Sequence, residues 1–167
     1  MPSVGPNVGP SAQPSAQVSV AETVQPIVAH EFAHFLYLFR AAYARCVDLP
    51  MTPETAIDNP DAVALWFAST FKPNTAPLRV ANLFNTDLED DELEISKLSK
   101  SSPLEMVVGG CMIALVAAVI VSGGTAQLLP PKFTLPPLGS GIKHLREAFR
   151  LPKNKPLKRK LKKRKSK

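Results

Sequence analysis

Cysteine is scarce in this chain, which has only two in 167 residues. Cys46 falls in a segment with a helical pattern and Cys111 lies inside a long apolar run, so we do not expect a disulfide between them. A disulfide-stabilised secreted scaffold is therefore excluded. The N-terminal segment has no charge before Glu22 and no hydrophobic core, so we expect no cleaved signal peptide.

Charged residues are absent from a second stretch, residues 106–131, whose first part is almost purely apolar. About 20 apolar residues in a helix, at about 1.5 Å each, cross the ~30 Å hydrocarbon core of a bilayer. The stretch therefore predicts a single transmembrane helix over residues 103–129. The alternatives are burial of the run inside the protein and a membrane-embedded hairpin.

Charge is distributed unevenly around this run. Residues 1–105 hold 6 Lys/Arg and 13 Asp/Glu, a net charge of −7, whereas residues 132–167 hold 14 Lys/Arg and one acid, a net charge of +13. Within about 20 residues of the run, Lys97 and Lys100 on one side balance Lys132 and Lys143 on the other, so the distal basic tail decides, and we place the C-terminus in the cytoplasm. The predicted location is the cell membrane, with a single pass.

Small residues recur at every fourth position of the apolar run, at Gly110, Ala114, Ala118 and Ser122. On a spanning helix they form one face that lets a second helix approach closely. We therefore expect this face to support a homo-oligomer.

The C-terminal part is basic. Residues 130–151 predict a juxtamembrane strand and a short basic amphipathic helix, and residues 152–167 predict a disordered polybasic tail. We expect the cations of both segments to bind anionic lipid head groups. They are Lys143, Arg146, Arg150, Lys158, Arg159, Lys160, Lys162, Lys163, Arg164 and Lys165. Nucleic-acid binding through phosphates is the alternative, although the tail has no aromatic residue to stack on bases.

The region before the run predicts a small α+β domain over residues 26–102. Residues 1–25, rich in Pro, Ser and Gln, predict a disordered tail ahead of it. Apolar residues at three- and four-residue steps predict a helix over residues 27–47. Alternating apolar and polar residues over 78–84 and 93–98 predict a β-hairpin with a long acidic loop.

Two proline-containing pairs mark further helix starts. Thr52-Pro53 and Asn59-Pro60 each place a capping residue before a proline. They predict a short turn from Pro53 and a second helix from Pro60 to about residue 70.

One motif carries possible metal chemistry. His30-Glu31-Phe32-Ala33-His34 resembles the H-E-x-x-H motif of zinc peptidases. The resemblance implies that His30 and His34 are zinc ligands and that Glu31 is the general base.

The rest of the zinc-peptidase pattern is missing. Arg40 stands where a metzincin has its third histidine, and Tyr37 stands where it has a glycine. Glu54 and Asp58, the nearest downstream acids of a gluzincin-like pattern, fall in a short proline-bounded turn. The simpler interpretation is that both histidines are polar positions of an ordinary amphipathic helix.

A second resemblance rests on the order of segments. Ser102-Pro103-Leu104-Glu105 follows a predicted strand and precedes the apolar run, after a helix with F-x-x-F-L-Y-L-F. This order resembles uncharacterised bacterial membrane proteins with a strand–SPLE–hydrophobic arrangement. The resemblance implies a membrane-associated accessory protein and supplies no catalytic residues.

The sequence thus predicts an α+β fold, with a domain of two helices and a β-hairpin, then one transmembrane helix and a short basic helix. The predicted function is that of a membrane-anchored interaction or regulatory protein without catalysis or cofactor, acting on an unknown protein partner. The alternatives are a zinc metallopeptidase and a nucleic-acid-binding protein that uses the polybasic tail.

Overall fold

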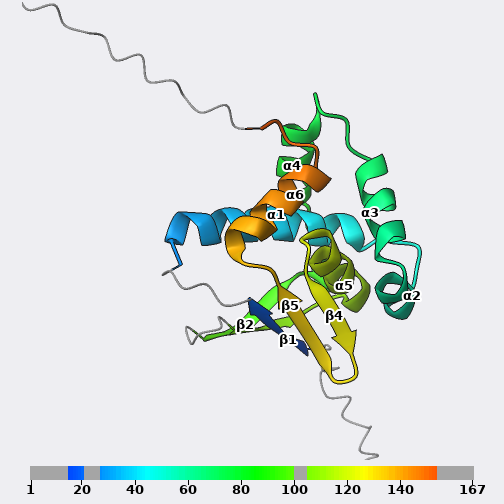
Figure 1. Cartoon of the computed structure of the whole chain (residues 1–167), viewed down its shortest axis with the longest axis vertical. Helices are drawn as coiled ribbons and strands as arrows, with labels where there is room; N and C mark the ends of the chain where they lie inside the picture. Colours follow the sequence, from blue (N-terminus) through cyan, green and yellow to red (C-terminus); the bar gives the residue numbers. More distant parts are fainter. Residues whose placement is uncertain (1–14, 21–26, 100–104, 154–167) are drawn as a thin grey trace, which may run out of the picture.

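The computed structural model describes residues 15–20, 27–99 and 105–153, which form a mixed five-stranded sheet with helices on one side of it (Figure 1). The strands are β1 (Ser15–Val20), β2 (Glu94–Ser99), β3 (Glu105–Gly109), β4 (Thr125–Leu128) and β5 (Pro131–Leu135). The helices are α1 (Ala29–Cys46), α2 (Pro53–Asp58), α3 (Pro60–Ser69), α4 (Ala76–Phe84), α5 (Met112–Val121), α6 (Leu138–Ala148) and the 3-10 turn η1 (Glu89–Asp91). The α+β fold class is confirmed.

Strand β1 lies in the middle of the sheet, whose order is β2-β3-β1-β5-β4. It pairs antiparallel with β3 and parallel with β5, so that Val18 lies between Met106 and Phe133. Its residues are alternately buried and more exposed, as in a sheet with one covered face. The predicted disorder over residues 1–25 is wrong for this strand, and the rest of that range lies outside the described residues.

The apolar run does not form one long helix, but divides into β3, α5, β4 and the start of β5. Helix α5 has 10 residues, about 15 Å in length, or half the thickness of a hydrocarbon core. Within the described ranges, no helix combines the length and the apolarity needed to cross a bilayer. The transmembrane helix predicted over residues 103–129 is therefore wrong. The single-pass membrane location, with its assignment of the C-terminus to the cytoplasmic side of the span, and the membrane-anchored role depended on this helix and are contradicted with it.

Glycines lie just before and just after α5 and limit its length. Gly110 precedes it with φ of +140°, and Gly123 follows it with φ of +81°, values that other residues rarely adopt. The amides of Gly123 and Gly124 donate to the carbonyls of Ile120 and Val119, both at 2.9 Å. This is a Schellman turn, which ends the helix and directs the chain into β4.

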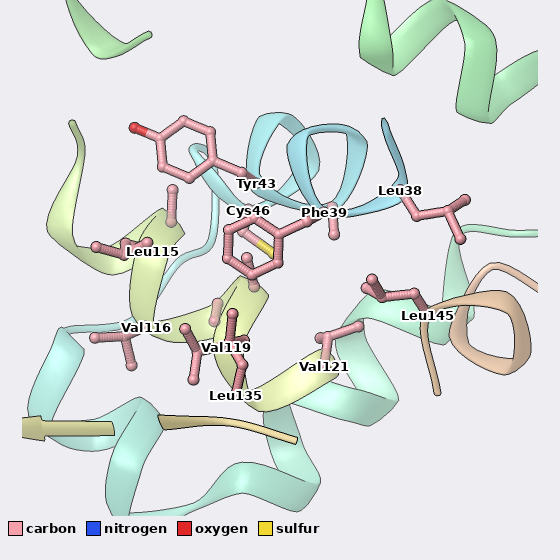
Figure 2. Packing of buried hydrophobic residues seen from close by; sticks show 14 of the residues in the cluster. Leu38, Phe39, Tyr43, Cys46, Leu115, Val116, Val119, Val121, Leu135 and Leu145 are labelled. Carbon is pink, nitrogen blue, oxygen red and sulfur yellow. The ribbon is translucent and has the colours of Figure 1, made fainter. Parts of the chain in front are cut away.

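Protein encloses α5 from several directions. It contacts α1, α2, α3 and α6 as well as β4 and β5, and residues 114–119 are at most 2% exposed. Figure 2 shows Phe39 and Cys46 of α1 close to Val119 of α5 in this core. Burying each large apolar side chain contributes about 1.5–3 kcal/mol, so a helix without a polar face is stable here in water.

The small residues of the run have a different role from the predicted one. Ala114, Ala118 and Ser122 are completely buried inside the domain, and Gly110 precedes the helix. Their size lets α5 pack closely against neighbouring helices rather than against a second spanning helix. Self-association of the chain stays a prediction, but the face of small residues on which it was based is buried and does not support it.

The first three helices follow their sequence signals. Helix α1 confirms the prediction for residues 27–47. The predicted caps are also present: the Thr55 amide donates to Thr52 Oγ1 at 3.3 Å, and the Ala62 amide donates to Asn59 Oδ1 at 3.2 Å.

The predicted β-hairpin is wrong in its first half. Residues 78–84 lie in helix α4, where Ala76 and Val80 are buried one turn apart. Pro77 occupies the first turn of this helix, a start signal of the same kind as Pro53 and Pro60. The second predicted strand is β2, whose partner is β3.

Helix α6 packs its apolar side onto the domain. A Cβ atom at Gly141 would lie 2.9 Å from the ring of Phe35 in α1, and Phe149 contacts the rings of Phe67 and Phe71. This apolar side is therefore not free to lie on a membrane surface. Lys143 is exposed; the tail cations lie outside the described residues, and lipid binding stays a prediction.

The enclosed position of α5 makes a testable prediction. Ala118→Ile is expected to lower the free energy of unfolding by about 1–3 kcal/mol, because no space exists for three more carbon atoms. Urea unfolding followed by circular dichroism measures the change. Ala64→Ile is the matched control, since Ala64 is an exposed alanine in α3. Equal stability of the two variants would contradict the enclosure.

Candidate anion-binding cleft

The H-E-x-x-H motif lies in the first turns of α1. His30 and Glu31 are exposed, whereas His34 is half-buried and turned toward α6. Burial lowers the pKa of His34 below its usual 6.5, and the positive charges of Arg146 and His30 lower it further.

These residues do not fit a zinc site in the part of the chain that the structure describes. No group of three His, Cys, Asp or Glu side chains there is arranged to hold a metal ion. The charge of Arg146 near His34 would also repel a divalent cation. Zinc binding and the role of Glu31 as a base stay predictions without structural support.

Arg40, at the position of the missing third histidine, binds the acidic segment instead. Its guanidinium group donates to both carboxylate oxygens of Glu92, at 3.0 and 2.5 Å. It also donates to the carbonyls of Leu83 and Thr86, at 3.0 and 2.7 Å, and to that of Phe84. A bidentate, partly buried pair of this kind is among the stronger polar contacts in proteins. Arg40 therefore holds the C-terminal end of α4.

Tyr43, one turn further along α1, connects two more segments. Its hydroxyl donates to the Asp91 carbonyl and accepts from the Cys111 amide, each at 2.6 Å. A Cβ atom at position 110 would lie 2.4 Å from this hydroxyl, so only glycine fits beside it. Burial is the largest cause that raises the pKa of Tyr43, to about 12.

A cleft opens beside this network, between the ends of α1, α3 and α4. Its volume is about 390 Å³, and it is open to solvent. Two arginines, three neutral polar residues and two apolar residues line it: Arg45, Arg79, Thr70, Asn82, Thr86, Phe71 and Leu83.

Thr70 brings the two guanidinium groups of the cleft together. Its Oγ1 accepts a hydrogen bond from Arg45 Nη2 at 3.0 Å, and its carbonyl accepts one from Arg79 Nη1 at 2.5 Å. Arg45 comes from α1 and Arg79 from α4, so side chains far apart in the sequence converge on one residue, Arg45 on its hydroxyl and Arg79 on its backbone carbonyl. Arg45 is half-buried and Arg79 is exposed to solvent, and an anion that contacts both would be attracted by both positive charges.

Arg45 is half-buried, whereas Arg79 is exposed to solvent. Its guanidinium carbon lies 3.9 Å from the centroid of the Trp66 ring, in a stacked cation–π contact. Its Nε atom is buried and has no hydrogen-bond partner within the described chain. A buried donor without a partner is costly, so the hydrogen bonding of this group is incomplete in the protein alone.

No acidic residue balances these charges. Among the described residues, neither Arg45 nor Arg79 forms an ion pair, whereas Arg40 pairs with Glu92. No Asp, Glu or His lines the cleft. The cleft is thus positively charged and suited to an anion.

Arg40 does not line the cleft, but its hydrogen bonds hold two residues that do. Leu83 and Thr86 line the cleft, and their carbonyls are the ones that Arg40 holds. The position of the α4 wall therefore depends on a contact outside the cleft, the pair of Arg40 with Glu92.

The sequence patterns did not predict this site. They placed Arg79 on a strand, whereas the residue lies in a helix, and they gave Arg45 no role. A usable signal was present: Thr75-Ala76-Pro77 marks a helix start, and on a helix Arg79, Asn82, Leu83 and Thr86 share one side. The predicted site residues, in contrast, do not converge on this cleft.

Comparison of the chain with models of protein families, with curated proteins and with solved structures gives no match.

The Tyr43 contacts make a prediction about alkaline stability. Because the folded pKa of about 12 exceeds the ordinary value of 10.0, the neutral phenol stabilises the fold fully below pH 10. This contribution is lost as the pH rises from 10 toward 12. Tyr43→Phe is expected to lower the free energy of unfolding at neutral pH by about 1–3 kcal/mol. It should also flatten the alkaline decline, measured by urea unfolding at several pH values.

Tyr37→Phe is the control, because Tyr37 is on the same helix and its ring contacts that of Phe84 in a tilted arrangement, with 4.7 Å between ring centroids. An alkaline decline that Tyr43→Phe leaves unchanged would show that the Tyr43 hydroxyl does not connect the two segments.

Proposed function

We propose that this protein binds a small anion in the cleft between α1, α3 and α4. The observation that carries the proposal is the convergence of Arg45 and Arg79 on Thr70 without an acidic counter-charge. A bound anion would be attracted by both guanidinium groups and would accept hydrogen bonds from N–H donors that Thr70 does not use.

The lining favours binding rather than catalysis. Its other polar groups are two hydroxyls and one amide, which are neutral and can donate or accept hydrogen bonds. No residue of the lining has a side chain that titrates near neutral pH to act as a general base. The proposed activity is therefore recognition of a ligand.

Nucleic-acid binding by the polybasic tail is a separate prediction. Residues 154–167 lie outside the described chain, and the cleft of Arg45 and Arg79 lies among α1, α3 and α4. Binding through the tail would weaken steeply between low and physiological salt. Truncation at residue 153 would abolish it and leave binding in the cleft unchanged.

Trp66, the only tryptophan of the chain, gives the binding test a direct signal. Since Arg45 stacks on its ring, titration with inorganic phosphate is expected to change its fluorescence in a saturable way. Arg79→Gln removes a charged donor without touching the ring, and should weaken the phosphate affinity about 10- to 100-fold. Arg45→Gln should weaken it similarly, measured by calorimetry because this variant alters the Trp66 environment itself.

Lys132→Gln is the control for net charge, since Lys132 is an exposed cation on β5. It should leave the affinity for phosphate unchanged. Equal weakening by Lys132→Gln and Arg79→Gln would show that phosphate responds only to overall charge, and the proposal would be wrong.

A further inference from the structure

We infer that the anion is a phosphomonoester with a small apolar body, an inference that rests on the proposed function. The cleft places a half-buried positive charge (Arg45), an exposed one (Arg79), additional hydrogen-bonding groups and an apolar wall around one volume of about 390 Å³. Each of these three features selects a different part of the ligand.

The two guanidinium groups select the charge. A carboxylate or a sulfate ester carries one negative charge and would leave one arginine uncompensated. A phosphomonoester carries about −1.5 to −2 at pH 7. Arg45 is half-buried and stacked on Trp66, so its uncompensated charge is not fully relieved by water. A dianionic head group therefore matches the pair best.

The polar lining selects the geometry of the head group. Arg45 and Arg79 each use one N–H donor on Thr70, and a guanidinium group has five N–H donors in a fixed plane. The Asn82 amide offers a further donor from the α4 side of the cleft. The three terminal oxygens of a phosphate can accept from donors on several sides at once, which the two oxygens of a carboxylate cannot.

The remaining wall selects the body. Phe71 is 2% exposed and Leu83 is half-buried, and both line the cleft. Cavities of about 300–1,000 Å³ accommodate small organic molecules, so inorganic phosphate alone leaves most of this one unfilled. The lining holds no acidic side chain to pair with an amine. The body of the ligand is therefore apolar and uncharged.

Phenyl phosphate and phenyl sulfate provide the test, because they have the same body and differ by about one charge. Phenyl phosphate is expected to bind about tenfold more tightly than phenyl sulfate at pH ~7.5, and more tightly than inorganic phosphate. The preference over phenyl sulfate should shrink near pH 5, below the second phosphate pKa of about 6. No Asp, Glu or His lines the cleft, so this pH dependence belongs to the ligand.

Arg79→Gln should remove most of the preference for phenyl phosphate over phenyl sulfate, since it leaves a single charge in the cleft. Lys132→Gln should leave the preference intact. Both titrations use Trp66 fluorescence on the full chain, with circular dichroism to confirm folding of the variants.

The outcomes separate the two proposals. Equal binding of the two phenyl esters, weakened by Arg79→Gln, would overturn the dianion inference and keep the anion-binding function. No saturable binding of any probe would overturn both. A short phosphotyrosine peptide separates two sources of the same group: affinity equal to that of phenyl phosphate indicates a free small molecule, and higher affinity indicates a modified side chain.

Discussion

The structure depends on one constraint, the need to enclose a helix that has no polar face. Helix α5 carries ten apolar residues in sequence, and exposure of any side of it to water would cost the apolar burial that stabilises the fold. Helix α1 covers one side, the β4–β5 end of the sheet covers another, and α2, α3 and α6 complete the enclosure. The small residues Ala114 and Ala118 let these neighbours approach closely.

Helix α1 links this core to the polar parts of the molecule. Its apolar stripe, including Phe39 and Cys46, packs toward α5, while Arg40, Tyr43 and Arg45 make the contacts that place other segments. Arg40 holds the end of α4, and Tyr43 joins the acidic segment to the start of α5. Because these residues are within two turns of one helix, the cleft and the core are positioned by the same element.

The cleft differs from the rest of this network in its charge balance. Arg40 has a carboxylate partner in Glu92, and its hydrogen bonds are extensive. Arg45 and Arg79 share only Thr70, and the Arg45 Nε atom has no partner in the described chain. A concave surface with two arginines that lack a carboxylate partner, one of them with a buried Nε donor that has no hydrogen bond in the described chain, has the features of a ligand site.

The sequence by itself determined the elements whose signals are local. The stripe of α1, the caps at Thr52 and Asn59, and the α+β class follow from periodicity and capping chemistry that depend on neighbours in the chain. Only the tertiary structure decided whether the apolar run crosses a membrane or fills a core, because apolarity alone does not say which surroundings exclude water. The tertiary structure also decided that β1 lies in the middle of the sheet and that Arg45 and Arg79 both bind Thr70. The strand pairs of β1 and the contacts of Arg45 and Arg79 with Thr70 join residues far apart in the sequence, and no local sequence pattern specifies which of them come together in space.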